Sequence, residues 1–205
     1  MSNSMGTVQC WKLYWRITDL GSLTRRYIVI GAFDGALTIV AIVLGALAAM
    51  MLFGAIIEPL DVKILISAGL AAAVGLAISS GWGAYEAERM ERKLEIKNLE
   101  QQLHRPLDGC MVDSAVRFAT VWASFIHGFA PIPAAILPLV PLILIPFDFM
   151  LAGIISVFIT MVFLFVLGLW MGHFAKANLI AGGLRMALAG VVTAILLVAL
   201  TIVFH

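Results

Sequence analysis

The sequence predicts an all-α, polytopic membrane protein, and its composition is the main reason for that prediction. Hydrophobic residues fill 62% of the 205 positions, charged residues only 12%, and the mean hydropathy is +1.06. Soluble domains contain about 45–50% apolar and about 25% charged residues, so this composition suits a bilayer. A transmembrane barrel needs polar residues that alternate with apolar ones, and the long apolar stretches exclude it. We therefore expect a helical bundle.

Five stretches that contain no Asp, Glu, Lys or Arg define the predicted membrane spans. Each is long enough to cross about 30 Å of hydrocarbon, which takes roughly 20 residues. We expect the first helix to extend backwards to Arg26, so that it includes Asp34. The five stretches are Gly35–Ile57, Ile64–Tyr85, Phe118–Phe147, Phe149–Ala175 and Met186–His205.

The basic residues are divided unevenly between the two predicted sides of the membrane. The side with the N-terminus holds twelve of the 13 Lys and Arg residues, and the opposite side holds Lys63 alone. The positive-inside rule therefore places the N-terminus in the cytoplasm. We predict a multi-pass protein of the cell membrane, or of an organellar membrane in a eukaryote. A net charge of +1 gives no basic field for nucleic acid, so no such partner is expected.

The predicted organisation has two parts, a short N-terminal segment and a membrane domain. Residues 1–24 mix basic and aromatic side chains, and we interpret them either as a cytoplasmic amphipathic segment at the membrane interface or as a disordered tail. Residues 25–205 form the five-helix transmembrane domain, which includes a cytoplasmic helical extension over residues 86–113.

Asp34 departs most clearly from the apolar pattern. A carboxylate within a span costs several kcal/mol unless it meets a partner, water or a cation, which makes it a functional-site candidate. Counted from Arg26 at 1.5 Å per residue, Asp34 lies roughly 12 Å into the helix. Gly31 and Gly35 flank it and leave room for a close helix or for an ion. The alternative is an Asp in the headgroup region, or one that serves helix packing.

His127 lies at a similar depth in the third span, roughly 15 Å beyond Arg117. Beside a carboxylate, an imidazole can bind a divalent metal or relay a proton, whereas alone it more often only packs. The same span holds five of the seven prolines, which free backbone carbonyls for a cation or simply kink the helix. These prolines are Pro131, Pro133, Pro138, Pro141 and Pro146.

The second span continues past Tyr85 without Gly or Pro until Pro106, which predicts one helix that runs on into the cytoplasm. Glu88, Glu91 and Glu95 share one helical face, where carboxylate oxygens suit a hard cation. Interleaved Lys and Arg residues, including a favourable Glu88–Arg92 pair at i, i+4, make a self-paired solvated face the alternative.

Two motifs resemble the vacuolar iron transporter family. Residues 31–35, Gly-Ala-Phe-Asp-Gly, are similar to the first-helix signature of that family, in which an Asp stands in a Gly-Ala-x-Asp-Gly frame. Residues 138–141, Pro-Leu-Val-Pro, resemble the Pro-Leu-x-Pro of its third helix. Five spans with a cytoplasmic N-terminus are also the plan of the family. The short segment 86–117 looks like a reduced branch that lacks the family's large cytosolic metal-binding domain.

The end of the second span resembles the family with two replacements. The family has Ser-Met-x-x-Gly-Glu-Tyr where this chain has residues 79–85, Ser-Ser-Gly-Trp-Gly-Ala-Tyr. The Ser, Gly and Tyr match. Ser80 and Ala84 replace the Met and Glu, which the family uses around its metal.

The resemblance implies a secondary transporter of divalent metal, iron or manganese, that exports the ion from the cytoplasm in exchange for protons. Asp34 would be the central ligand and proton acceptor, with His127 and Ser80 as secondary ligands or hydrogen-bond donors. The three extension glutamates would form a station that first captures the metal. The metal is the substrate, so no cofactor is expected, and no catalytic motif predicts an enzyme. The alternative is the same scaffold with a non-metal solute or a structural role.

A homodimer is the predicted assembly, and the resemblance implies it too. Ile96, Leu99 and Leu103 are spaced 3 and 4 along the extension and make a short coiled-coil seam. A helix that short is marginal alone in water, so we expect it to need a partner surface. Small residues such as Gly183 and Ala187 allow close helix contact, either between protomers or within one.

Overall fold

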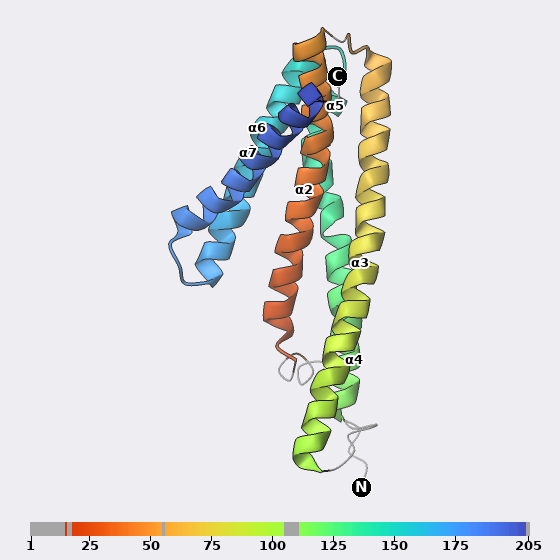
Figure 1. Cartoon of the computed structure of the whole chain (residues 1–205), viewed down its shortest axis with the longest axis vertical. Coiled ribbons are helices and arrows are strands. Elements are labelled where there is room, and N and C mark those ends of the chain that lie inside the picture. Colours follow the sequence, from red (N-terminus) through yellow and green to blue (C-terminus); the bar gives the residue numbers. More distant parts are fainter. Residues whose placement is uncertain (1–14, 16–17, 55, 105–110, 204–205) are drawn as a thin grey trace.

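A computed structural model describes residues 15, 18–54, 56–104 and 111–203, and all of its regular structure is helical (Figure 1). Five helices of the described chain are long and apolar enough to cross a membrane. The predicted all-α class with five spans is therefore confirmed, and the chain is a multi-pass membrane protein. Most of the predicted N-terminal segment, residues 1–14 and 16–17, lies outside the described residues.

Six helices of the described residues follow the chain order of the five spans, with the third span divided in two. That division comes at Ala130, immediately before Pro131, because a proline has no N–H to continue the helical ladder. The helices are α2 (Leu20–Phe53), α3 (Pro59–Leu103), α4 (Met111–Phe129), α5 (Pro131–Leu144), α6 (Phe149–Phe174) and α7 (Leu179–Val203).

Two acidic loop residues begin helices. The backbone N–H of Glu58 donates to the Asp61 carboxylate at 2.9 Å, and Pro59 follows at the first helical position of α3. The Asp148 carboxylate accepts from the Leu151 N–H at 3.0 Å and caps α6. Since free N–H groups and the helix dipole favour negative charge at a helix start, these carboxylates stabilise the helices at one end of the bundle.

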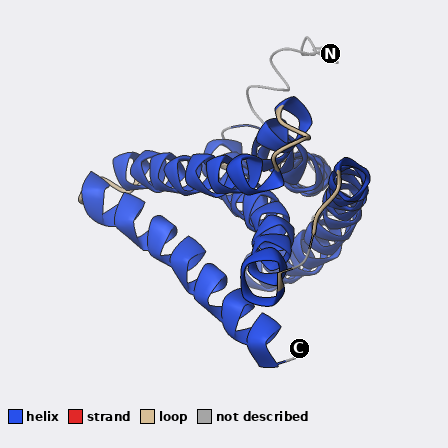
Figure 2. Ribbon diagram, turned by 90° about the horizontal axis from the view of Figure 1, so that it is seen from above, coloured by secondary structure: helices blue, strands red, loops and turns tan. Residues whose placement is uncertain are grey.

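α2 is the central helix, because it packs against every other described helix. α3 runs beside α4, and α6 runs beside α7. In Figure 1 the α6–α7 pair spreads away from α2 towards the turn that joins the two helices. Seen from above in Figure 2, α7 leans along the outside of the bundle, and among its described residues only Gly183 and Gly190 are buried.

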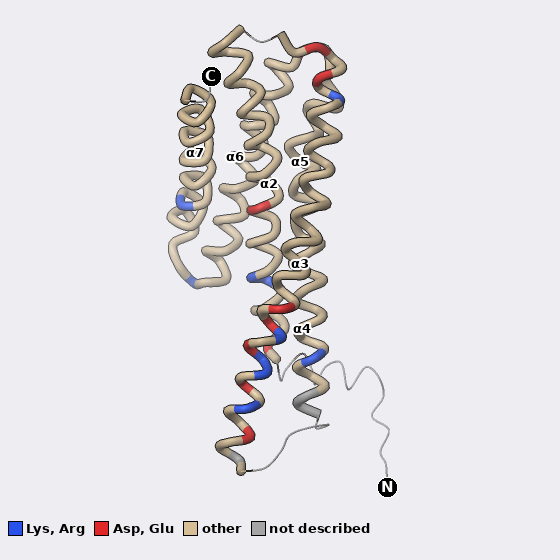
Figure 3. Tube along the Cα trace, turned by 45° about the vertical axis from the view of Figure 1, so that its right-hand side comes forward, with Lys and Arg blue, Asp and Glu red and all other residues tan. Residues whose placement is uncertain are grey.

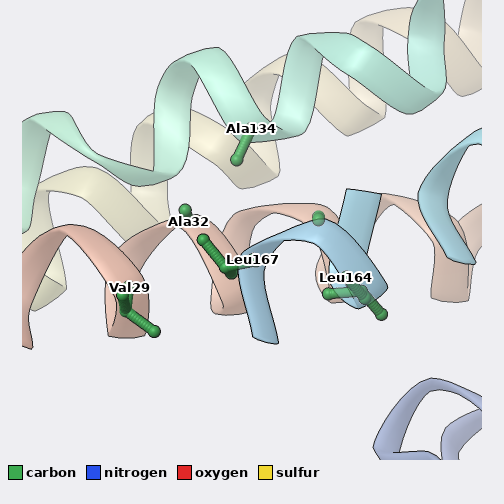
Figure 4. Packing of buried hydrophobic residues seen from close by; sticks show 6 residues of the cluster. Val29, Ala32, Ala134, Leu164 and Leu167 are labelled. Carbon is green, nitrogen blue, oxygen red and sulfur yellow. The ribbon is translucent and has the colours of Figure 1, made fainter. Parts of the chain in front are cut away.

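Small and aliphatic side chains form the core between the central helices. Figure 4 shows Val29 and Ala32 of α2, Ala134 of α5, and Leu164 and Leu167 of α6 gathered in one cluster. The alanines at these contacts let helices approach closely, which is the usual way that helices associate where lipid supplies no hydrophobic driving force.

Gly35 gives the tightest contact between α2 and α5. A Cβ added there would meet the carbonyl oxygen of Pro131 and lie 2.8 Å from the Cα of Pro131. The backbones therefore touch directly. Similarly, a Cβ at Gly81 of α3 would lie 3.3 Å from the Cα of Gly128 in α4.

Charged residues gather on the part of α3 that continues beyond the apolar bundle (Figure 3). The structure describes this extension as helix to Leu103, and His104 ends it in the left-handed conformation with φ of 55°. Residues 105–110 lie outside the described part, and the chain is helical again from Met111. Within the predicted extension 86–113, the described α3 helix thus covers residues 86–103.

Candidate functional site

Asp34 and His127 lie together within the bundle. Asp34 stands fourteen residues after Leu20, roughly 21 Å along α2 at 1.5 Å per residue, and is half-buried. His127, near the end of α4, is also half-buried and interacts electrostatically with Asp34. The structure therefore brings these two predicted site residues together from different helices.

The contacts of Tyr27 orient the imidazole of His127. The Nδ1 atom lies 3.4 Å from the Tyr27 carbonyl oxygen, and the two ring centroids are 4.9 Å apart. A carbonyl can only accept, so this contact assigns the proton of a neutral ring to Nδ1. The lone pair of the ring is then on Nε2, the nitrogen that a metal or a proton would use.

Glycine and proline together expose a backbone oxygen beside Asp34. Pro131 has no N–H, so it cannot donate to the carbonyl of His127 one turn earlier. That carbonyl oxygen lies 3.2 Å from where a Cβ would stand at Gly31. The missing side chain of Gly31 and the missing donor of Pro131 thus leave a carbonyl available as an oxygen ligand close to the carboxylate and the imidazole.

Ser80 lies on α3 at the level of His127 but is not placed in contact with Asp34. The neighbouring Gly81 packs against Gly128, and the Ser124 hydroxyl donates to the Gly81 carbonyl at 2.6 Å. Ser80 is half-buried, and within the described chain its hydroxyl forms no hydrogen bond. Ser80 thus adjoins the Gly81–Gly128 contact, and no described residue bonds its hydroxyl.

Glu88 is buried and tied to α2. Only 3% of its side chain is exposed, and one carboxylate oxygen accepts from the Tyr27 hydroxyl at 2.7 Å and from Arg26 at 3.0 Å. The Nε of Arg92 lies 3.4 Å from the second oxygen, without hydrogen-bond geometry. Two guanidinium groups thus compensate this carboxylate, and Tyr27 connects it to His127.

Glu91 and Glu95 are exposed, in contrast to Glu88. Glu95 pairs with Arg92 at 3.0 Å, as expected for the self-paired alternative. Among the described residues no three His, Cys, Asp or Glu side chains come together as a metal-binding group. The structure therefore does not gather the three glutamates into one cluster.

Sequence reasoning missed Arg26 and Tyr27 as partners of Glu88. They lie 62 and 61 positions away from it, so no spacing within one helix could indicate the contact. The only available signal was an arginine and a tyrosine at the membrane edge of a span, which is typical of many membrane helices.

Comparison with known proteins gives two matches. The VIT family profile matches residues 25–117, which include Asp34, Ser80 and the three glutamates and end before His127. An uncharacterized protein of Methanocaldococcus jannaschii is 30% identical over 181 residues, which cover 86% of this chain and 87% of that protein.

Proposed function

The chain belongs to the VIT family, the vacuolar iron transporter family, and from this membership we propose that it is a secondary transporter of divalent metal, with iron or manganese as its substrate. Members of this family are membrane transporters of metal ions and not enzymes. The observation that carries the proposal is the half-buried Asp34 within the first span, which interacts electrostatically with His127 of α4.

The donor atoms around Asp34 suit a transported transition metal. A carboxylate, an imidazole nitrogen and the freed carbonyl of His127 offer mixed oxygen and nitrogen ligands, which iron and manganese accept. Two side chains do not complete a coordination sphere. Water, the Ser80 hydroxyl or a second protomer would supply the rest. An incomplete protein sphere favours transport, because a transported ion must be bound weakly enough to leave.

Proton exchange follows from the same two side chains. A carboxylate and an imidazole bind metal only in their deprotonated forms, so metal binding releases protons and protonation releases metal. Each half-cycle then loads Asp34 and His127 with either protons or the metal. We propose export from the cytoplasm, driven by protons that enter from the opposite side.

The extension glutamates divide by environment. Glu91 and Glu95 are exposed, so they can attract a cation to the predicted cytoplasmic end. Glu88 lies between Arg26 and Arg92, and two guanidinium groups disfavour a cation there. We therefore propose that Glu91 and Glu95 capture the metal first. Glu88 instead joins α3 to α2.

Metal flux into proteoliposomes tests the proposal. We expect the wild-type chain to move iron or manganese, and Asp34→Asn to lower the flux tenfold or more, since about 1.4 kcal/mol of lost binding is a factor of ten. Asp148→Asn is the matched control, because it removes a carboxylate from a helix start while an asparagine still caps the helix.

Three outcomes would count against the proposal. Equal flux in wild type and Asp34→Asn would remove Asp34 from the ion path. Flux that is insensitive to the direction of an imposed pH gradient would contradict proton exchange. A wild-type protein that retains no metal after dialysis and transports neither ion would favour the alternative, the same scaffold with a non-metal solute or a structural role.

A further inference from the structure

A cavity of about 470 Å³ lies between α2, α6 and α7. Its volume is within the range of roughly 300–1,000 Å³ that is typical of ligand pockets. Its walls are almost entirely apolar, and neither Asp34 nor His127 lines it. The lining includes Val29, Phe33, Trp170, Phe174 and Met186.

Arg25 lines this cavity, and no carboxylate of the described residues pairs with it. Its guanidinium carbon lies 4.8 Å from the centroid of the Phe174 ring. The adjacent Arg26 is different, because it is paired with Glu88 at 3.0 Å. Within the part of the chain that the structure describes, Arg25 is therefore a cation on the cavity wall that no carboxylate neutralises.

A second cavity of about 290 Å³ adjoins the first and adds another cation. Arg185 of α7 lines it, is exposed, and likewise has no carboxylate partner in the described chain. The two cavities share part of their lining, and we treat them as one groove, which is almost entirely apolar on the side of Arg25 and more polar on the side of Arg185. The lining residues that the two share are Met171, Ala175 and Met186.

We propose that this groove binds one anionic phospholipid from the leaflet at the basic end of the bundle. An acyl chain lies against Val29, Phe33 and Met186, and the phosphate lies between Arg25 and Arg185. Basic pockets between transmembrane helices on the cytoplasmic side are suited to anionic head groups. Trp170 lines the same groove, at a depth where aromatic residues prefer the membrane interface.

Charge complementarity favours a lipid over a second copy of the chain. α6 and α7 contain no Asp or Glu, so a copy that docked through the same face would bring arginines to arginines. A zwitterionic lipid carries a cation beside its phosphate, so its head group has no net charge with which to neutralise the two arginines. An anionic phospholipid can neutralise the two arginines with its net negative charge and fill the apolar part of the groove with an acyl chain. The groove lies where the α6–α7 pair spreads away from α2 (Figure 1).

Quenching of Trp170 by brominated lipid tests the site without reference to transport. The full chain is reconstituted in phosphatidylcholine vesicles with a fixed fraction of acyl-brominated phosphatidylglycerol or of acyl-brominated phosphatidylcholine. Subtracting the Trp170→Phe variant isolates the signal of Trp170. We expect stronger quenching by the brominated phosphatidylglycerol than by the brominated phosphatidylcholine.

The double variant Arg25→Gln/Arg185→Gln should lower the preference for phosphatidylglycerol about 30-fold, the value for two cations at about 1 kcal/mol each. Arg89→Gln is the matched control, because that arginine is exposed on the α3 extension, far along the chain from the groove. Quenching by the brominated phosphatidylcholine shows that each variant is inserted and folded, and the control should keep the preference of the wild type.

Two further measurements distinguish other occupants. Equal quenching by the two lipids, or an unchanged preference in the double variant, would overturn the proposal. So would displacement of the brominated lipid by inorganic phosphate, which would mean a site for the head group alone. Absence of quenching by either lipid, with Phe174→Cys forming covalent dimers, would assign the groove to a second copy.

Discussion

Replacement of Gly35 by alanine should separate α2 from α5. The added Cβ would meet the carbonyl oxygen of Pro131 and lie 2.8 and 2.9 Å from its Cα and carbonyl carbon. Favourable carbon contacts lie near 3.5–4.0 Å, so the helices would have to move apart by about 1 Å. Backbone atoms cannot rotate out of the way as a side chain can. We therefore expect a cost of about 3 kcal/mol, the upper part of the range for overpacking.

Thermal unfolding in detergent, followed by intrinsic fluorescence, measures this effect. For a chain of this size about 3 kcal/mol corresponds to a midpoint lowered by roughly 6–12 °C. Gly45→Ala is the matched control, since Gly45 lies on the same helix and a Cβ there would meet no atom within 4 Å. Alanine is also the better helix former, so the control should melt at the wild-type temperature or slightly above it.

The same substitution should also reduce metal flux, because Gly35 adjoins Asp34 and α5 follows the helix that carries His127. If Gly35→Ala and Gly45→Ala unfolded at the same temperature, the direct backbone contact between α2 and α5 would be refuted.

Two further predictions concern the α3 extension. Tyr27→Phe removes the 2.7 Å hydrogen bond to the buried Glu88 and should lower the free energy of unfolding by about 1.5–3 kcal/mol, measured by thermal melting. Tyr85→Phe is the control and should lower it little, because the Tyr85 hydroxyl has no hydrogen bond in the described chain. Equal melting midpoints for the two variants would show that the Tyr27 hydroxyl does not hold α2 to α3. Leu99→Glu should weaken the proposed homodimer, which is measured as the molar mass in detergent and in lipid. Leu94→Glu lies off the predicted seam and should leave the dimer intact. A wild-type chain that is monomeric in both media would exclude the dimer.

The membrane spans could be predicted because hydrocarbon thickness fixes how long an apolar stretch must be. The residues at which the helices begin were harder to predict from the sequence. α2 begins at Leu20 rather than at Arg26, and α3 begins at Pro59 within a segment that was expected to be a loop. Charged residues next to a span are expected in a loop, but Glu58 is the N-cap of α3 and Asp61 lies in its first turn.

The candidate site was predictable only in part. Depth along a helix placed Asp34 and His127 at one level, and the fold brings them together. Periodicity also put Glu88 on one face with Glu91 and Glu95, yet Glu88 alone is buried. Which turn of a helical face is covered depends on the helix opposite, and here Arg26 and Tyr27 of α2 cover Glu88. A pattern within one helix contains no information about that neighbour.

The electrostatic interaction of Asp34 with His127 also sets a condition on biosynthesis. His127 is made 93 residues after Asp34, which is about 5–20 s at ordinary rates of elongation. During that time the nascent first span must enter the bilayer with a carboxylate that costs about 2.5–3.5 kcal/mol on the insertion scale. Between Ile28 and Leu47, eleven residues are Leu, Ile, Val or Phe. At roughly 0.3–0.6 kcal/mol each they outweigh that cost, so the first helix can be integrated by the translocon before its partner leaves the ribosome.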